Sequence, residues 1–226
     1  VQIAKISPIN AGERVWTVTP QDVAIIGELF LTGKFNATRT VALAGSEVKD
    51  AQYYNVISGA AIADLVAGKI EGDNVRVISG DVLTGTKVKM NGNLGFLSNT
   101  VTVIPEGNVY RMFGWMPFAS PSVHSASRTG LSWLMPGKKY APNTNLNGEE
   151  RALVVTGEME TVMPLDIFPM QLLKACLASD IDKMESLGIY EVAPEDFALI
   201  DYTNTSKLEA QQIIREALDL MIKEVG

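Results

Sequence analysis

The segment 148–206 constrains the fold most, because its prolines and glycines divide it into short helices. Pro169 and Pro194 each stand where a helix can begin, since proline lacks only the N–H that a first helical turn leaves unpaired. Gly188 stands where a helix can end. Compact helical domains of this kind hold iron–sulfur clusters in many redox proteins, but a cluster needs about four thiolates. Because Cys176 is the only cysteine, the sequence predicts a helical domain without a cluster.

Composition and charge narrow the class of protein. The 226 residues allow one domain or two, and they carry 19 Lys and Arg against 26 Asp and Glu, a net charge of −7. These charges are spread along the chain and form no basic stripe, so we expect no nucleic-acid partner. Every apolar run is shorter than the ~18 residues that a membrane span needs. With one cysteine and no amino-terminal signal, we expect a soluble chain in a reducing cytoplasm.

Residues 19–33 carry the clearest helix signals. Thr19 is placed to cap the helix, Pro20 suits its first position, and Gly33 can end it in the left-handed conformation. Asp22 lies near the positive end of the helix dipole. Apolar side chains recur at three- and four-residue spacing and form a wide face, which we expect to be buried. They are Val23, Ile25, Ile26, Leu29 and Phe30.

Residues 39–104 predict a small α+β domain. Apolar residues that alternate with small or polar ones, or that form short β-branched runs, indicate strands at 39–44, 56–57, 75–78 and 101–104, with a helical pattern at 60–67 between the second and third. One helix laid over one mixed sheet is a β-grasp arrangement, which buries one face of each element. The sequence therefore predicts a β-grasp domain in this region.

Motifs of known catalytic and metal sites are incomplete in this sequence. The stretch 80–87, GDVLTGTK, nearly spells a phosphate-binding loop, but its Lys and Thr stand in the wrong order, so we predict a hairpin. His124, the only histidine, is flanked by serines, yet no G-x-S-x-G motif accompanies it. We expect a hydrogen-bonded loop histidine there and a buried structural thiol at Cys176. One His and one Cys exclude the usual zinc ligand sets, and no G-x-G-x-x-G fingerprint follows a strand.

The segment 105–150 is rich in Pro, Gly, Ser and Asn, yet it is too aromatic for a free linker. The simpler interpretation is that its aromatic side chains pack two domains together. The alternative is a groove for a flat apolar ligand such as a quinone ring, since ligand pockets are mostly apolar with a few orienting polar groups. The candidate contact residues for such a ligand are Phe113, Trp115, Met116, Phe118, His124 and Arg128.

The carboxy-terminal residues predict one amphipathic helix. Ser206 and Glu209 have the spacing of a capping box. Apolar residues between Ile214 and Val225 recur on one stripe, opposite charged residues. This stripe packs on the preceding helices or, in the alternative interpretation, meets a partner subunit.

Seven blocks of the sequence resemble, in the same order, the A subunits of bacterial sodium-translocating NADH:quinone oxidoreductases. The blocks are VWTVTPQDVAIIGELFLTGKF (15–35), RTVALAGSEVK (39–49), DLVAGKI (64–70), NVRVISGDVLTG (74–85), FGWMPF (113–118), VMPLDIFPMQLLKA (162–175) and GIYEVAPEDFALIDYTNT (188–205). The resemblance covers nearly the whole chain. It identifies the chain with about the carboxy-terminal half of such a subunit.

The resemblance implies four regions. Residues 1–38 would be the end of a Rossmann-like domain whose upstream elements cover the apolar face of the first helix; without those elements, the face is exposed or covered by a neighbour. Residues 39–104 would be a β-grasp domain of the soluble-ligand-binding type (SLBB). Residues 105–150 would connect it to residues 151–226, an α-helical domain derived from a ferredoxin-like one but lacking iron–sulfur ligands.

The resemblance also implies a function. The chain would belong to a peripheral subunit on the cytoplasmic face of the bacterial inner membrane, held there by the partner subunits of a translocase that oxidises NADH, reduces ubiquinone and exports sodium. NADH, flavins and the iron–sulfur cluster would reside on those other subunits. This chain would contribute to assembly and to quinone access, with no cofactor and no catalytic residue of its own. Two alternatives stay open: a stand-alone quinone-binding module, and an independent hydrolytic enzyme that uses His124 and its neighbouring serines.

Overall fold

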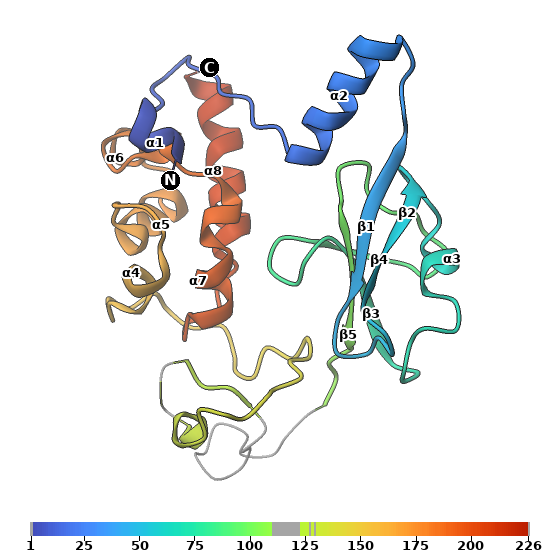
Figure 1. The fold of residues 1–226 in the computed structure, drawn as a ribbon. Helices are drawn as coiled ribbons and strands as arrows, with labels where there is room; N and C mark the ends of the chain where they lie inside the picture. The colour runs from blue at the N-terminus through green and yellow to red at the C-terminus, as the bar shows by residue number, and fades with distance from the viewer. Residues whose placement is uncertain (1, 110–122, 127, 129, 226) are drawn as a thin grey trace.

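The computed structural model describes residues 2–109, 123–126, 128 and 130–225. Figure 1 shows a sheet lobe, residues 38–105, beside a helical lobe, residues 151–225. The chain begins near the helical lobe with α1 (Gln2–Ile6) and crosses to the sheet lobe, where α2 (Pro20–Thr32) lies. Within the described residues, no helix combines the length and apolar character that a bilayer span requires.

The sheet lobe is a mixed five-stranded sheet in the order β2-β1-β5-β3-β4. Strand β1 is parallel to β5 and antiparallel to β2, while β3 is antiparallel to both β4 and β5. The hairpin predicted at 80–87 is confirmed, because β3 and β4 pair on either side of its turn. The strands are β1 (Thr38–Ala44), β2 (Gln52–Ile57), β3 (Val75–Ser79), β4 (Thr86–Val88) and β5 (Thr100–Pro105).

Strand β2 corrects one boundary of the predicted fold. The sequence placed a strand at 56–57 only, but the strand begins at Gln52, which pairs with Leu43 of β1. Its side chains are exposed at Gln52 and Tyr53 and alternate between half-buried and exposed from Tyr54 onwards. Backbone pairing with β1 therefore decides the start of this strand, where apolar patterning is too weak to mark it.

The core of the sheet lobe lies on the sheet face next to α3 (Ile62–Val66). Along β1, the side chains of Arg39, Val41 and Leu43 are buried while Thr38 and Thr40 are exposed, which is the period of a strand with one buried face. The buried apolar residues of this core are Val41, Leu43, Ile62, Leu65, Val66, Val77, Leu94, Val101 and Val103.

The helical lobe packs short helices around a second core. Pro169 begins α5, Pro194 begins a 3₁₀ turn, and Gly188 follows α6 at a φ of 88°, so the predicted helix boundaries are confirmed. The helices are α4 (Glu158–Val162), α5 (Pro169–Leu177), α6 (Ile181–Ser186), α7 (Ala198–Thr203) and α8 (Ala210–Glu224). Fully buried members of the core include Met170, Leu172, Leu173, Met184, Ile189, Phe197, Ile200 and Ile214.

Cys176 belongs to this second core. Its side chain is buried, as the sequence predicted, and burial raises the pKa of its thiol to about 11. A thiol with so high a pKa stays protonated near neutral pH, and the thiolate is the form that attacks or binds metals. Cys176 therefore acts as a small apolar residue of the core.

The start of α8 differs from its prediction. Glu209 stands at the N-cap without a side-chain hydrogen bond, and Ser206 Oγ donates to the carbonyl oxygen of Ala152 at 3.1 Å, so the predicted capping box is wrong. The cap comes instead from Asp201 of α7, whose carboxylate accepts hydrogen bonds from the backbone N–H groups of Ala210 (2.5 Å) and Gln211 (3.4 Å). A side chain on a neighbouring helix satisfies this first turn.

Helix α2 begins and ends as predicted, but it is not buried. Thr19 Oγ1 accepts a hydrogen bond from the backbone of Asp22 at 3.2 Å, and Gly33, at a φ of 70°, donates to the carbonyl oxygen of Leu29 at 2.8 Å. None of the residues of α2 is buried, and Phe30 is 85% exposed. The apolar face of α2 therefore lacks, within the described residues, the cover that the sequence predicts for it.

The two lobes meet at the tip of the β3–β4 hairpin. Asp81 fixes this turn by accepting hydrogen bonds from the backbone N–H groups of Leu83 (2.7 Å) and Thr84 (2.9 Å). The side-chain amide of Gln211, in the first turn of α8, donates to the carbonyl oxygen of Leu83 at 2.9 Å.

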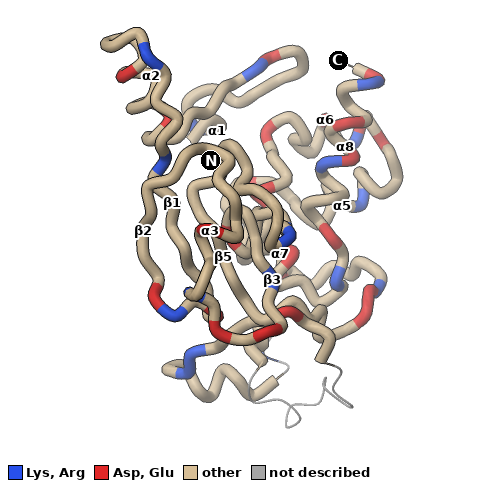
Figure 2. Tube along the Cα trace, turned by 90° about the vertical axis from the view of Figure 1, so that its right-hand side faces the viewer, with Lys and Arg blue, Asp and Glu red and all other residues tan. Residues whose placement is uncertain are grey.

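The helical lobe is acidic. Residues 151–226 carry fourteen Asp and Glu against six Lys and Arg, and Figure 2 shows the two signs interspersed around α5, α6 and α8. The hairpin thus contacts the more acidic of the two lobes.

Candidate functional site

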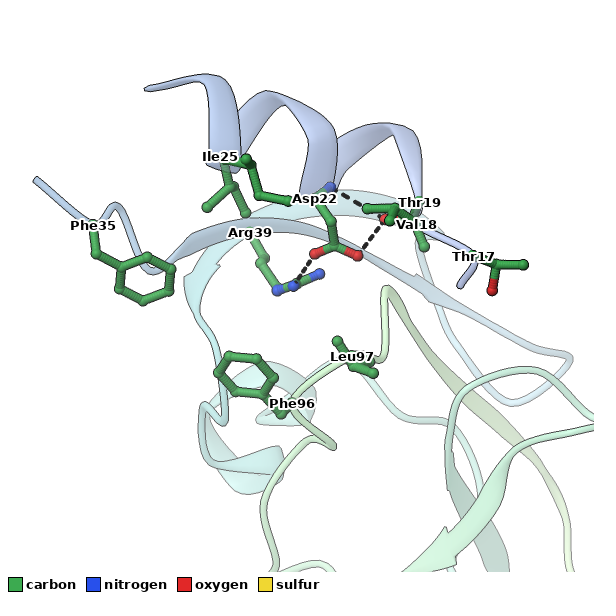
Figure 3. Close-up of a pocket in the computed structure, with 10 residues that line it drawn as sticks. Thr17, Val18, Thr19, Asp22, Ile25, Phe35, Arg39, Phe96 and Leu97 are labelled. Carbon is green, nitrogen blue, oxygen red and sulfur yellow. Dashed lines mark hydrogen bonds and ion pairs between the residues drawn. The ribbon is translucent and has the colours of Figure 1, made fainter. Parts of the chain in front are cut away.

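An open hollow of about 500 Å³ lies between α2 and the sheet lobe (Figure 3). One wall is formed by Val18, before the helix, and by Ile25 and Ile26 of α2. The facing wall is formed by Phe35 and by Phe96 and Leu97, which lie in the loop before β5. Five of these six apolar side chains are between 46% and 66% exposed, so the hollow is open to solvent.

An ion pair between a buried arginine and a partly exposed aspartate lines this hollow. The Arg39 guanidinium, only 4% exposed, pairs with the carboxylate of Asp22. Arg39 also donates from Nε to Ser58 Oγ at 2.9 Å and from Nη1 to Asn99 Oδ1 at 3.2 Å, and its Cζ lies 5.6 Å from the centre of the Phe96 ring. Charge-assisted hydrogen bonds of this kind are the strong ones in proteins, so Arg39 is held firmly.

The first turn of α2 supplies the anionic partner. Thr19 Oγ1 donates to Asp22 Oδ2 at 2.7 Å, and this hydrogen bond together with the Arg39 guanidinium keeps the pKa of the Asp22 carboxyl below its usual value. Asp22 is therefore ionised at neutral pH and fully engaged. A paired carboxylate of this kind is poorly suited to take a proton from a substrate.

Gln21 fixes α2 to the edge of β1. Its side-chain Oε1 accepts from the backbone N–H of Thr40 at 2.8 Å, and its Nε2 donates to Asn99 Oδ1 at 3.0 Å. Thr40 pairs with Asn55 of β2 on one side, but β5 begins only at Thr100, which lies opposite Ala42, so the β5 side of β1 has no strand partner at Thr40. The carboxamide of Gln21 therefore takes the place of a strand amide and positions Asp22 over Arg39.

The lining of this hollow is mostly apolar. Its walls are apolar, its two charges neutralise each other, and it presents neither a histidine nor a thiol. In the part of the chain that the structure describes, no group of three or more His, Cys, Asp or Glu is arranged to hold a metal ion. The hollow is suited to an uncharged apolar molecule or to an apolar protein surface.

The residues that the sequence predicted as quinone contacts lie elsewhere. Phe113, Trp115, Met116 and Phe118 fall outside the described residues. His124 and Arg128 are described and exposed, in a loop segment that Figure 1 places at the other end of the sheet lobe from α2.

His124 is the hydrogen-bonded loop histidine that the sequence predicted. Its Nδ1 lies 3.2 Å from the Tyr202 hydroxyl, its ring stacks on that tyrosine, and the Tyr140 ring meets it edge-on. Among the neighbouring serines, Ser125 Oγ accepts from the backbone of Gly130 at 3.1 Å. Because Tyr202 belongs to α7, these contacts tie the loop to the helical lobe.

Sequence reasoning missed Arg39 and Phe96. One signal was available for Arg39, because it stands in the same strand register as Val41 and Leu43, and a charge in a buried register predicts a partner. For Asp22, the sequence predicted only a favourable position near the positive end of the helix dipole. No local signal connects Asp22 with Phe96, since the chain brings them together through the whole sheet lobe.

Two family models match the chain. The NQRA C-terminal domain, an SLBB-type model, matches residues 40–90, which cover β1 to β4, and the NqrA second alpha/beta domain matches residues 1–35, which include α2. The sheet lobe and the helix beside it therefore represent two domain types of one protein family. The residues of the hollow that precede Asn36 lie in the second of these matches, whereas Arg39, Phe96 and Leu97 lie outside both.

Similar proteins name that family. The A subunit of the Na(+)-translocating NADH-quinone reductase of Neisseria meningitidis serogroup B is 38% identical over 220 residues, which are 97% of this chain and 49% of the relative. The A subunits of Serratia proteamaculans and Hahella chejuensis are 39% and 38% identical to the chain, and these matches also span 97% of the chain and 49% of each relative. The chain belongs to the family of A subunits of Na(+)-translocating NADH-quinone reductases. It spans about half the length of the curated relatives that it matches.

Proposed function

We propose that the chain works as part of the A subunit of a Na(+)-translocating NADH-quinone reductase, at the cytoplasmic face of the inner membrane, where it contributes to assembly and to quinone access. The observation that carries this proposal is the identity of 38% across 97% of the chain to such an A subunit. The other subunits of the complex are its partners and hold it at the membrane. NADH, flavins and the iron–sulfur cluster belong to those partners.

The described side chains favour a docking role. The charged groups of the hollow are paired, the thiol of Cys176 is buried and protonated, and His124 is engaged with aromatic rings. Apolar residues are instead exposed in quantity around α2, where Trp16 is 90% exposed and Leu31 is 89% exposed. Large exposed apolar surfaces mark sites where proteins bind one another.

A chimera tests this proposal. The 220 matched residues of the Serratia A subunit are replaced by this chain, and the tagged chimera is produced in a strain that lacks its own A subunit. We expect the other subunits to co-purify with the chimera from detergent-solubilised membranes. A chimera that is folded, as judged by circular dichroism, but purifies alone would contradict the proposal.

The second candidate function is a stand-alone quinone-binding module, and the apolar hollow favours it. A quinone ring could lie between Phe35 and Phe96, with a carbonyl oxygen accepting from Arg39. Titration with a short-chain quinone should then quench tryptophan fluorescence with saturation, through Trp16 beside the hollow. Phe96→Ala should abolish the saturation, whereas Phe168→Ala, an equally exposed phenylalanine of the helical lobe, should not. Linear quenching in the parent protein would rule this candidate out.

A further inference from the structure

The two edges of the sheet differ in how they are protected. An edge strand presents unpaired backbone groups, and proteins usually protect it by keeping the strand short or by placing charge, proline or a β-bulge in it. Strand β4, at one edge, is only three residues long and carries Lys87. Strand β2, at the other edge, has six residues without charge or proline. Its register with β1 is continuous, so it also lacks a bulge.

The outer side of β2 is open. Among the residues that the structure describes, no strand pairs with this side. Figure 2 shows β2 at the rim of the molecule, with β1 beside it and no segment on its other side. Tyr53 is 76% exposed and Ile57 is 67% exposed. The strand therefore has a free edge that is long, uncharged and accessible.

Tyr53, Asn55 and Ile57 direct their backbone groups to this free edge. On β1, the N–H of Thr40 bonds on the β5 side, to the side chain of Gln21 at 2.8 Å. In an antiparallel ladder, the residue opposite such a position also turns its N–H and C=O away from the shared side. Thr40 lies opposite Asn55. Asn55, and the residues two positions before and after it, therefore offer hydrogen bonds outwards.

The side chains of β2 are arranged symmetrically about Asn55. If two copies of the strand lie antiparallel with Asn55 opposite Asn55, each Tyr53 lies opposite the Ile57 of the other copy, and each Tyr54 lies opposite Val56. Pairs of aromatic and β-branched residues are among the favourable cross-strand pairs. The strand contains no charged residue, so this pairing brings no like charges together. Strand β2 is thus complementary to itself.

From these observations we infer that β2 is an interface between two copies of this chain, which join their sheets antiparallel about a two-fold axis at Asn55. The N–H and C=O groups of the two Asn55 residues bond to each other across the axis. Such an isologous contact uses the free edge of both copies. The remaining edges are the protected β4 strands, so assembly stops at the dimer.

Cysteine substitutions test the register of this pairing. In a hydrogen-bonded antiparallel pair, opposite Cα atoms lie about 5.5 Å apart, within the roughly 4.4 to 6.8 Å that a disulfide spans. Asn55→Cys should therefore form a disulfide between copies under mild oxidation, visible as a dimer on a non-reducing gel. Tyr53→Cys is the matched control, because its two copies would lie about 14 Å apart along the strands. The native Cys176 is buried and should not react.

Analytical ultracentrifugation measures the association itself. We expect the mass of the chain to rise with concentration from 24.4 kDa towards twice that value. Ile57→Lys places a charge in the new strand pair and should weaken association by about tenfold or more. Ile222→Lys, on a residue of α8 that is 69% exposed, should leave association unchanged. Both variants should keep the circular dichroism of the parent, since neither residue belongs to a core.

Four results would overturn the inference. One is a parent chain that remains a monomer at every concentration. Another is a dimer that Ile57→Lys does not weaken, since a different surface would then join the copies. The third is a disulfide that forms as readily in Tyr53→Cys as in Asn55→Cys. The fourth is an Asn55→Cys form of the Serratia chimera that cross-links to another subunit and not to itself, which would make that subunit the occupant of the edge.

Discussion

Arg39 is the one charged side chain that is buried among the residues the structure describes. Its pairing with Asp22 ties the first turn of α2 to the sheet lobe. Removing Arg39 leaves the Asp22 carboxylate without its charged partner, and because the Asp22 side chain is 17% exposed, water offsets part of that loss. We therefore expect Arg39→Met to lower the free energy of unfolding by about 1 to 3 kcal/mol in urea denaturation, the range for losing a hydrogen bond to a charged group.

A second substitution, at Asp22, distinguishes the loss of the ion pair from the loss of packing around Arg39. The double variant Arg39→Met with Asp22→Leu should recover most of the lost stability, because apolar groups of similar size can replace a buried ion pair. Arg215→Met, whose partner Glu195 is as exposed as Arg215 itself, should change stability by less than about 1 kcal/mol. Equal losses in Arg39→Met and in the double variant would show that the ion pair is not the cause.

Glu106 joins the end of β5 to the loop-rich segment. Its carboxylate accepts from Arg76 (2.5 and 3.2 Å), from Lys87 (3.0 Å) and from the Thr144 hydroxyl (2.8 Å). These partners, Arg76 first, lower the pKa of Glu106 to about 2. A carboxyl whose pKa is lower in the folded state stabilises the fold above its unfolded pKa of about 4.5 and loses that effect as the pH falls towards 2.

Glu106→Gln should therefore flatten the pH dependence of stability. In the parent protein, the urea midpoint should fall between pH 5 and pH 2, and the difference between parent and variant should shrink over the same interval. Other carboxylates with lowered pKa values, such as Asp22 and Asp180, contribute equally to both proteins and cancel in this difference. A constant difference across the interval would contradict the assignment.

At the scale of elements, α8 depends on a side chain from α7. Asp201→Ala should lower stability by about 1 to 2 kcal/mol, the usual cost of losing a helix cap. It should also speed hydrogen exchange at the amides of Ala210 and Gln211, which Asp201 accepts from. Ser206→Ala removes the hydrogen bond to Ala152 and should leave those two amides unchanged. Faster exchange in Ser206→Ala would restore the capping box that the sequence predicted.

Helix boundaries could be predicted because their determinants are local. Pro169, Gly188 and Gly33 act through their own backbone geometry, and each boundary that they predicted is present. The cap of α8 and the early start of β2 could not be predicted, since both depend on residues that are distant in sequence. The same holds for the hollow, whose walls come from α2, the segment after it and the loop before β5.

At the scale of the whole molecule, the described residues form two packed cores, and exposed apolar side chains such as Trp16, Phe30 and Leu31 gather on and beside α2. The contact between Gln211 and Leu83 connects the helical lobe to the β3–β4 hairpin. The chain contains regions matched by two domain models of one family and spans about half the length of its relatives. This organisation agrees with the proposed role of the chain, which is to dock to other parts of the complex and not to carry a cofactor itself.

The most direct test of the proposed role is the activity of membranes in which the Serratia chimera replaces the native A subunit. Inverted membrane vesicles are supplied with NADH and a quinone, and quinone reduction is followed with and without sodium. The proposal predicts sodium-stimulated quinone reduction and sodium uptake by these vesicles. Vesicles that hold the chimera together with the other subunits, yet reduce no quinone and take up no sodium, would contradict it.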